Sequence, residues 1–257
     1  MNRISEAFKG KKAFIPFITG GDPDIATTER LITALAENGA DIIEIGIPFS
    51  DPVAEGPVIQ AADERALSGG CTVDKLFEMV SRISGKVGVP LLFMTYYNPI
   101  FAYGAERFCE NCKKSGIAGL IVPDLPFEEA NELKIYTKKA EISLISLIAP
   151  TSNDRVKMIA KEAEGFLYCV SSLGVTGVRA NIGNAAEAMI KTAKTVSDIP
   201  CAVGFGVSTE AQAAAAAQYA DGVIVGSAIV KIVAEYGADS PEKVAQFARG
   251  IKKALDN

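Results

Sequence analysis

Short apolar runs rich in β-branched residues recur along the chain and alternate with segments of helical periodicity. Most of the runs are continuously apolar, which is typical of parallel strands covered on both faces. The runs span residues 13–19, 41–47, 90–97, 118–124, 142–148, 165–171, 201–207 and 221–227. The helical patterns span residues 26–39, 73–84, 105–116, 128–140, 153–165, 185–197, 209–220 and 241–255.

Eight such units in 257 residues predict a (β/α)₈ TIM barrel, an α/β fold. A doubly wound open sheet is the alternative, but it usually has fewer strands and an early glycine-rich dinucleotide turn. The segment "SEAF" near the N-terminus predicts a short helix that covers the barrel floor. No change of composition marks a linker, so we expect one domain over residues 1–257.

The spacing of the units is uneven, and the stretch from Pro48 to Gly70 after the second strand is the longest insertion. Active sites of TIM barrels lie in the loops at the carboxyl ends of the strands. This enlarged loop after strand two is therefore the first place to look for chemistry.

Glu44 lies in the middle of the second strand, where successive side chains alternate in direction. Ile43, Ile45 and Ile47 suit the face that packs on helices, so Glu44 and Gly46 point into the barrel, with Gly46 leaving space above Glu44. A desolvated carboxyl has a raised pKa and can transfer protons near neutral pH. The alternative is a buried structural Glu paired with a cation or with backbone.

A second carboxylate, Glu55, follows in the proline-rich loop "PFSDPVAEGP". On chemistry alone, Asp51 and Glu55 are equally well explained as solvated loop charges.

Three glycine-rich turns follow the last three strands. Backbone N–H groups and helix N-termini bind phosphate, and barrels often place one between the loops after strands seven and eight. We therefore expect Gly177, Gly206, Gly226 and Ser227 to hold a phosphate, although any one of these glycines also suits a plain turn. Residues 173–187 are glycine-rich as well, and they suit either a lid or an ordinary surface loop.

Composition narrows the possible functions. The net charge of −5 and the lack of a basic cluster argue against nucleic acid, and no apolar run reaches the ~20 residues of a membrane helix. The N-terminus lacks a signal-peptide pattern and the five cysteines suggest no disulfide framework, so we expect a cytoplasmic protein. Cys109 and Cys112 form a C-x-x-C, either a redox or half-zinc motif or simply two thiols at helical spacing.

The chain contains no histidine. This absence rules out a Ser-His-Asp triad, a Cys-His pair and histidine-ligated metals. Glu, Asp, Tyr, Lys or Cys must then carry any acid–base catalysis.

Motifs along the whole chain resemble those of the tryptophan synthase α subunit family. They are "FITGGDPD", "IEIGIPFSDPVAEGPVIQ", "GLIVPDLPFEE", "LIAPTS", "SSLGVTGVR", "VGFGVST" and "GVIVGSAIV". The resemblance implies a lyase that cleaves indole-3-glycerol phosphate to indole and glyceraldehyde 3-phosphate. It also implies a pyridoxal-phosphate β subunit that receives the indole, an α₂β₂ assembly, and no cofactor or metal in the α chain itself.

The same resemblance implies roles for individual residues. Glu44 is the general acid and base, and Glu55 takes the place of the carboxylate that stabilises positive charge at the indole nitrogen. The resemblance also places five residues around the substrate: Phe17, Tyr96, Tyr168, Thr176 and Phe205. Core packing is the alternative for the four aromatic residues among them. The resemblance further places Gly177, Gly206, Gly226 and Ser227 at the phosphate, and Asp51 and Asp124 toward the β subunit.

Position 55 departs from the family pattern, in which Asp is usual. The extra methylene of Glu55 moves the charge by about 1–1.5 Å, and a misplacement of that size can cost roughly 10²-fold in rate. We favour accommodation by the loop, since the flanking residues follow the pattern.

Three rival functions remain at this stage. The first is an autonomous lyase that releases free indole, and the second is a catalytically weak homologue that mainly activates a β subunit. The third is another phosphate-binding barrel, such as a sugar-phosphate isomerase, against which the motif of the second loop argues.

Overall fold

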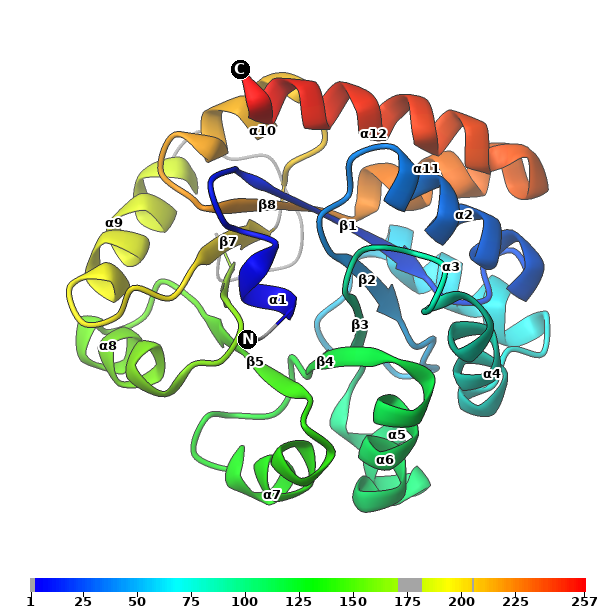
Figure 1. Ribbon diagram of the computed structural model, residues 1–257, viewed down its shortest axis with the longest axis horizontal. Coiled ribbons are helices and arrows are strands. Elements are labelled where there is room, and N and C mark those ends of the chain that lie inside the picture. Colours follow the sequence, from blue (N-terminus) through cyan, green and yellow to red (C-terminus); the bar gives the residue numbers. More distant parts are fainter. Residues whose placement is uncertain (1–2, 171–181, 205) are drawn as a thin grey trace.

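The computed structural model describes residues 3–170, 182–204 and 206–257. Within them, eight parallel strands close into a barrel in sequence order, with β1 paired to both β2 and β8 (Figure 1). The strands are β1 Ala13–Thr19, β2 Ile43–Gly46, β3 Leu91–Met94, β4 Ile117–Ile121, β5 Ser143–Ile148, β6 Leu167–Val170, β7 Cys201–Gly204 and β8 Gly222–Val225. The predicted barrel is confirmed.

Helices surround the barrel in a ring (Figure 1). Those that follow the strands are α2 Ile25–Glu37, α3 Pro57–Ser68, α4 Val73–Ile83, α5 Tyr97–Tyr103, α6 Ala105–Ser115, α7 Asn131–Ala140, α8 Asn153–Glu162, α9 Ile182–Lys194, α10 Glu210–Ala217, α11 Ser227–Tyr236 and α12 Ser240–Asp256, with a 3₁₀ turn η1 at Gly237–Asp239. Every predicted helical segment overlaps one of these helices. The sequence analysis did not predict α3, α5 and α11.

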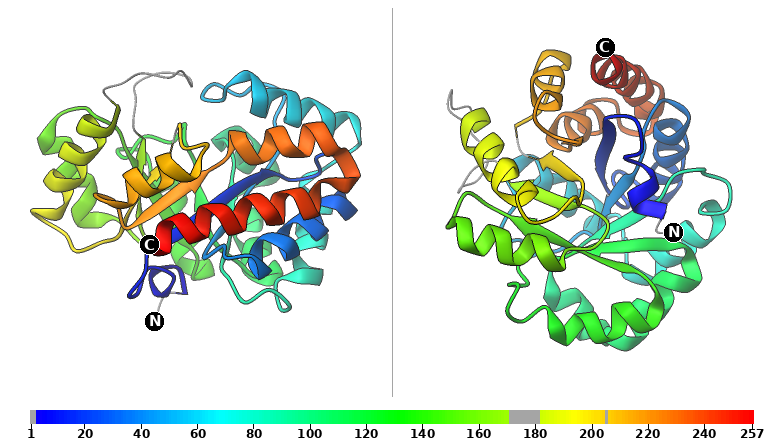
Figure 2. Two further views of the ribbon diagram at one scale, coloured as in Figure 1. Left: turned by 90° about the horizontal axis from the view of Figure 1, so that it is seen from above. Right: turned by 60° about the vertical axis from the view of Figure 1, so that its left-hand side comes forward.

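The short helix α1, Arg3–Glu6, lies below the barrel in the side view, at the amino-terminal end of the strands (Figure 2, left). Ile4 and Phe8 are buried in the same cluster as barrel-interior residues such as Ile42 and Ile224. They therefore plug the floor of the barrel, as the segment "SEAF" predicted.

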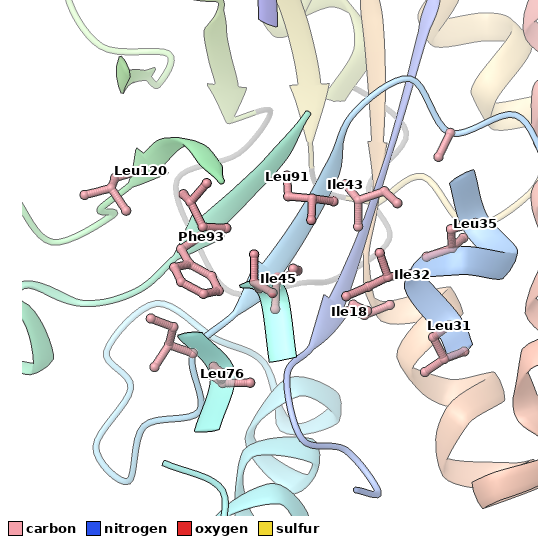
Figure 3. Close-up of a cluster of buried hydrophobic side chains, with 14 of the residues drawn as sticks. Ile18, Leu31, Ile32, Leu35, Ile43, Ile45, Leu76, Leu91, Phe93 and Leu120 are labelled. Carbon is pink, nitrogen blue, oxygen red and sulfur yellow. The ribbon is translucent and has the colours of Figure 1, made fainter. Parts of the chain in front are cut away.

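Side chains on β2 alternate between two apolar layers. Ile43 and Ile45 belong to the layer between the barrel and its helices, where Figure 3 shows them with Leu31 and Leu76. Ile42 belongs to the barrel interior. Because side-chain direction alternates along a strand, Glu44 shares the inner face with Ile42. The orientation predicted for the second strand is therefore correct.

Candidate active site

Glu44 is fully buried inside the barrel, beside Phe17 of β1 and Leu92 of β3 in the strand register. Neither of its carboxylate oxygens has a hydrogen-bond partner among the described residues. Burial without a compensating partner disfavours the charged form and raises the pKa of Glu44 well above the usual value. A structural ion pair is therefore excluded within the described part of the chain. What remains is a buried carboxyl group whose raised pKa favours the protonated form.

The inner-face aromatic residues lie over glycines of the next strand. The ring of Phe17 on β1 occupies the space beside Gly46 on β2, with its Cζ 2.6 Å from an ideal Cβ at that position. Tyr168 on β6 has the same relation to Gly204 on β7, where its Cε1 is 2.6 Å from the ideal Cβ. The space expected above Glu44 at Gly46 is thus filled by the Phe17 ring, which corrects the sequence interpretation.

Tyr168 is buried close enough to Glu44 for a charge on Glu44 to affect the pKa of its phenol. Desolvation and then the charge of Glu44 raise the pKa of the phenol well above its usual value. Both aromatic side chains, Phe17 and Tyr168, therefore stand in the barrel interior near the buried acid, and their contact with substrate stays a prediction.

Glu55 is held in the loop after β2 by two neighbours, and Glu44 is not one of them. Its carboxyl lies next to the side chains of Asp63 and Tyr96, and its Oε2 is buried with no hydrogen-bond partner among the described residues. The Tyr96 hydroxyl also accepts the backbone N–H of Ala54 at 3.0 Å, which fixes the loop next to Glu55. The interpretation of Glu55 as a solvated loop charge is therefore wrong.

Asp63 is the residue of this cluster that the sequence analysis missed, because residues 48–70 were treated as a loop. Residues 57–68 instead form helix α3, which begins at Pro57 after Gly56. Ile59, Ala62, Asp63 and Ala66 make up its buried face. The Gly-Pro start and this helical spacing were the signals that could have revealed the helix and its buried acid.

Two of the predicted phosphate turns are described, and Gly177 lies outside the described residues. Gly206 has a φ of +85°, a left-handed conformation that favours glycine. Gly226 is the N-cap of α11, has no side-chain cap, and precedes Ser227, the first residue of that helix. The start of α10 is different, because Thr209 and Gln212 form a complete capping box there. The N-terminus of α11 is therefore the better anion site of the two.

Asp51 and Asp124 lie in the loops after β2 and β4, as the sequence predicted. Asp124 accepts the backbone N–H of Tyr97, at the start of α5, at 2.9 Å. Tyr97 follows Tyr96, which contacts both Glu55 and the ring of Phe49. The loops after β2, β3 and β4 thus meet at Tyr96 and Tyr97. Thr176 and Phe205 lie outside the described residues.

The remaining motifs have structural explanations. Cys109 and Cys112 are buried on α6, and burial raises the pKa of both thiols. Two buried thiols at helical spacing are therefore what this C-x-x-C forms. Residues 3–170, 182–204 and 206–257 contain no group of three or more His, Cys, Asp or Glu arranged to hold a metal ion. In that same part of the chain, no helix combines the length and apolar character of a membrane span.

These features define a TIM barrel that carries a buried acid in its interior and a second acid in the loop after β2. Residues 5–256 match the family described as tryptophan synthase alpha chain. The chain belongs to this family. Its members are carbon–carbon lyases that cleave indole-3-glycerol phosphate, so the predicted family and reaction are confirmed.

Individual relatives resemble the chain over its whole length. The tryptophan synthase alpha chain of Lacticaseibacillus casei is 44% identical over 256 residues, which cover 100% of this chain and 96% of the relative. A structure of Mycobacterium tuberculosis tryptophan synthase has a TM-score of 0.91 at 37% identity and covers 100% of this chain and 99% of its own. Tryptophan synthase subunit alpha from Legionella pneumophila has a TM-score of 0.90 at 37% identity, with the same coverage.

Proposed function

We propose that this chain cleaves indole-3-glycerol phosphate with Glu44 as its acid–base group. The observation that carries the proposal is the carboxyl of Glu44, fully buried in the barrel with no partner for either oxygen among the described residues. Burial raises the pKa of Glu44 and so favours its protonated form, as a general acid requires.

The proton balance of the reaction needs only one such group. Glu44 gives its proton to C3 of the indole ring, which breaks the aromaticity and leaves positive charge toward the ring nitrogen. The bond between C3 and the glycerol carbon then breaks, and its electron pair returns to the ring. The ionised Glu44 takes the proton of the glycerol hydroxyl as the aldehyde forms, which regenerates the starting acid.

Glu55 stabilises the positive charge that develops at the indole nitrogen. A fixed carboxylate next to developing charge contributes most where it is preorganised and shielded from water. The neighbouring side chains of Asp63 and Tyr96 supply that preorganisation. We propose that the extra length of Glu relative to Asp is accommodated by these two contacts.

The substrate phosphate binds at the carboxyl end of the barrel. Gly206 and the uncapped N-terminus of α11, at Gly226 and Ser227, offer backbone N–H groups and the positive end of a helix dipole. We include Gly177 in this site from the sequence alone. Phe17, whose Cβ lies 3.4 Å from an ideal Cβ at Gly226, then stands between the phosphate and Glu44.

A pyridoxal-phosphate β subunit is the proposed partner, in an α₂β₂ assembly, and this chain is proposed to need no cofactor of its own. Two large apolar side chains near the predicted interface support docking, because Val53 is 76% exposed and Phe101 is 71% exposed. Asp51 and Asp124 lie in the same loop region and are the proposed contact residues. Five free cysteines fit the reducing cytoplasm as its location.

The test is the release of glyceraldehyde 3-phosphate from indole-3-glycerol phosphate by the purified chain, with and without a cognate β subunit. Slow release that the β subunit strongly accelerates is the expected result. Fast release by the chain alone would instead identify an autonomous lyase. An activated β subunit with no release in either condition would identify a binding partner without catalysis.

A further inference from the structure

Glu55 and Asp63 bring two carboxyl groups together where the loop after β2 meets α3. Their carboxyl groups lie within reach of a hydrogen bond if one of them carries a proton, and Asp63 is only 4% exposed. When both groups are treated as ionised, Glu55 Oε2 and Asp63 Oδ2 are buried acceptors with no donor among the described residues. Two carboxylates can offer each other only acceptors, so a single proton between these groups satisfies both oxygens.

We propose that Asp63 holds this proton and donates it to Glu55, as a positioning residue that keeps the Glu55 carboxylate charged and oriented. The inference rests on the proposed role of Glu55 in stabilising charge on the substrate. Asp63 itself lies on α3 and acts only through Glu55, without touching a reacting atom. Its task is to hold the catalytic carboxylate still.

The surroundings place the proton on Asp63 rather than on Glu55. The pKa of Asp63 is raised to about 9. Burial is the largest cause, followed by the contact with Glu55 and the charge of Glu55, and the charge of Asp22 adds a smaller contribution. The Glu55 side chain is only partly buried, whereas Asp63 is 4% exposed. Burial raises the pKa of Glu55, and the side chains of Asp63 and Tyr96 oppose this rise and favour its ionised form. A carboxyl pair that cannot ionise twice separates in this way into one acid and one base.

Two further contacts limit the rise in the pKa of Asp63 without reversing it. The backbone N–H of Phe49 faces the Asp63 carboxyl and lowers its pKa, but burial outweighs this contribution. Arg65, two residues along α3, donates two hydrogen bonds of 2.8 and 2.7 Å to the carboxylate of Asp22. The charge of Asp22 is therefore largely balanced by its own partner, and Glu55 remains the main anion facing Asp63.

The direct experiment is a carbon-13 NMR titration of the free chain labelled at the aspartate carboxyls. D63N identifies the Asp63 signal by its loss, and we expect that signal to titrate near pH 9 in the wild type. In E55Q the like charge is gone and an amide donor replaces it, so the same signal should titrate at least roughly two pH units lower. An Asp63 signal that titrates near the ordinary ~3.9, or that does not move in E55Q, overturns the proposal.

The pH dependence of kcat separates a positioning role of Asp63 from a merely structural one, because a structural role would not change it. We expect kcat of the wild type with its β subunit to fall above about pH 9, as Asp63 ionises and repels Glu55. D63N keeps a donor that cannot titrate, so it should retain activity at neutral pH and lose the alkaline fall. D63A should lower kcat by roughly tenfold or more with a smaller change in KM. E64Q, a neighbouring exposed residue on α3, is the matched control and should follow the wild type.

The outcomes separate this inference from the proposed function. If Asp63 titrates as expected and indole-3-glycerol phosphate is not cleaved, the proton assignment stands and the proposed function fails. If cleavage occurs but D63N keeps the alkaline fall and D63A matches the wild type, Asp63 does not position Glu55.

Discussion

The ring of Phe17 occupies the position that a Cβ on Gly46 would take, since its Cζ lies 2.6 Å from that point. Phe17 also packs in one buried cluster with Ile59 and Ala62 of α3 and Val230 of α11. It therefore has little room to move aside. A glycine two residues beyond Glu44 is thus a packing requirement of the aromatic wall beside the buried acid.

G46A should consequently destabilise the protein and slow the reaction. Forcing a methyl group into a filled space costs about 1–3 kcal/mol, and any shift of Phe17 disturbs the site beside Glu44. Urea unfolding and kcat measure the two effects. G88A is the matched control, because nothing lies within 4 Å of a Cβ at Gly88. Equal stability and kcat in the two variants would show that Phe17 yields freely.

Burial of Glu44 makes stability depend on pH. The pKa of Glu44 is raised in the fold, so its contribution to stability is full below the unfolded value of about 4.3 and falls as pH rises toward the raised pKa. Relative to E44Q, the wild type should lose about 1.4 kcal/mol of unfolding free energy per pH unit across that window. Urea unfolding of both proteins from pH 4 to pH 9 measures the difference. A constant difference would mean that Glu44 is not desolvated.

Tyr96 anchors the loop that carries Glu55, because its hydroxyl accepts the Ala54 N–H at 3.0 Å and lies next to the Glu55 carboxyl. Y96F removes the hydroxyl that makes both contacts, so we expect kcat to fall about tenfold and stability to fall by about 1 kcal/mol. Steady-state kinetics with the β subunit measure the first effect. Y136F, on α7 and outside this network, should leave kcat unchanged. If the two variants behave alike, the Tyr96 hydroxyl does not position the loop.

Phosphate binding provides an independent prediction at Gly206. Its φ of +85° strains any other residue, so G206A should weaken the binding of glycerol phosphate about tenfold or more by displacing the N–H groups of the turn. Calorimetry of glycerol phosphate binding measures this effect. G10A is the control, because Gly10 also has a positive φ and open space around its Cβ, but lies next to the barrel floor. Equal affinities in both variants would contradict the proposed phosphate site.

The barrel could be predicted from the sequence because the strands are short and continuously apolar, so each stands out from the polar helical patterns around it. Three helices escaped prediction for local reasons. Pro57 and the surrounding glycines made α3 resemble a loop, and the aromatic residues Tyr96 and Tyr97 at the start of α5 extended the predicted third strand. Helix α11 is rich in Ile and Val, which are equally typical of strands.

The site was predictable only in part. Alternation along β2 was enough to place Glu44 inside the barrel. The neighbours of Glu55 were not predictable, because Asp63 and Tyr96 reach it only after α3 and the loop following β3 fold against each other. The filling of Gly46 by Phe17 depends in the same way on the register between β1 and β2, which places Phe17 beside Glu44.

The most direct measurement of the central claim is the release of glyceraldehyde 3-phosphate by E44Q in complex with its β subunit. Gln keeps the size of Glu44 but cannot transfer a proton, so release should fall by about 10²–10⁴-fold or more, while glycerol phosphate still binds with wild-type affinity. Release at the wild-type rate by a folded E44Q protein would show that the buried carboxyl is not the acid–base group.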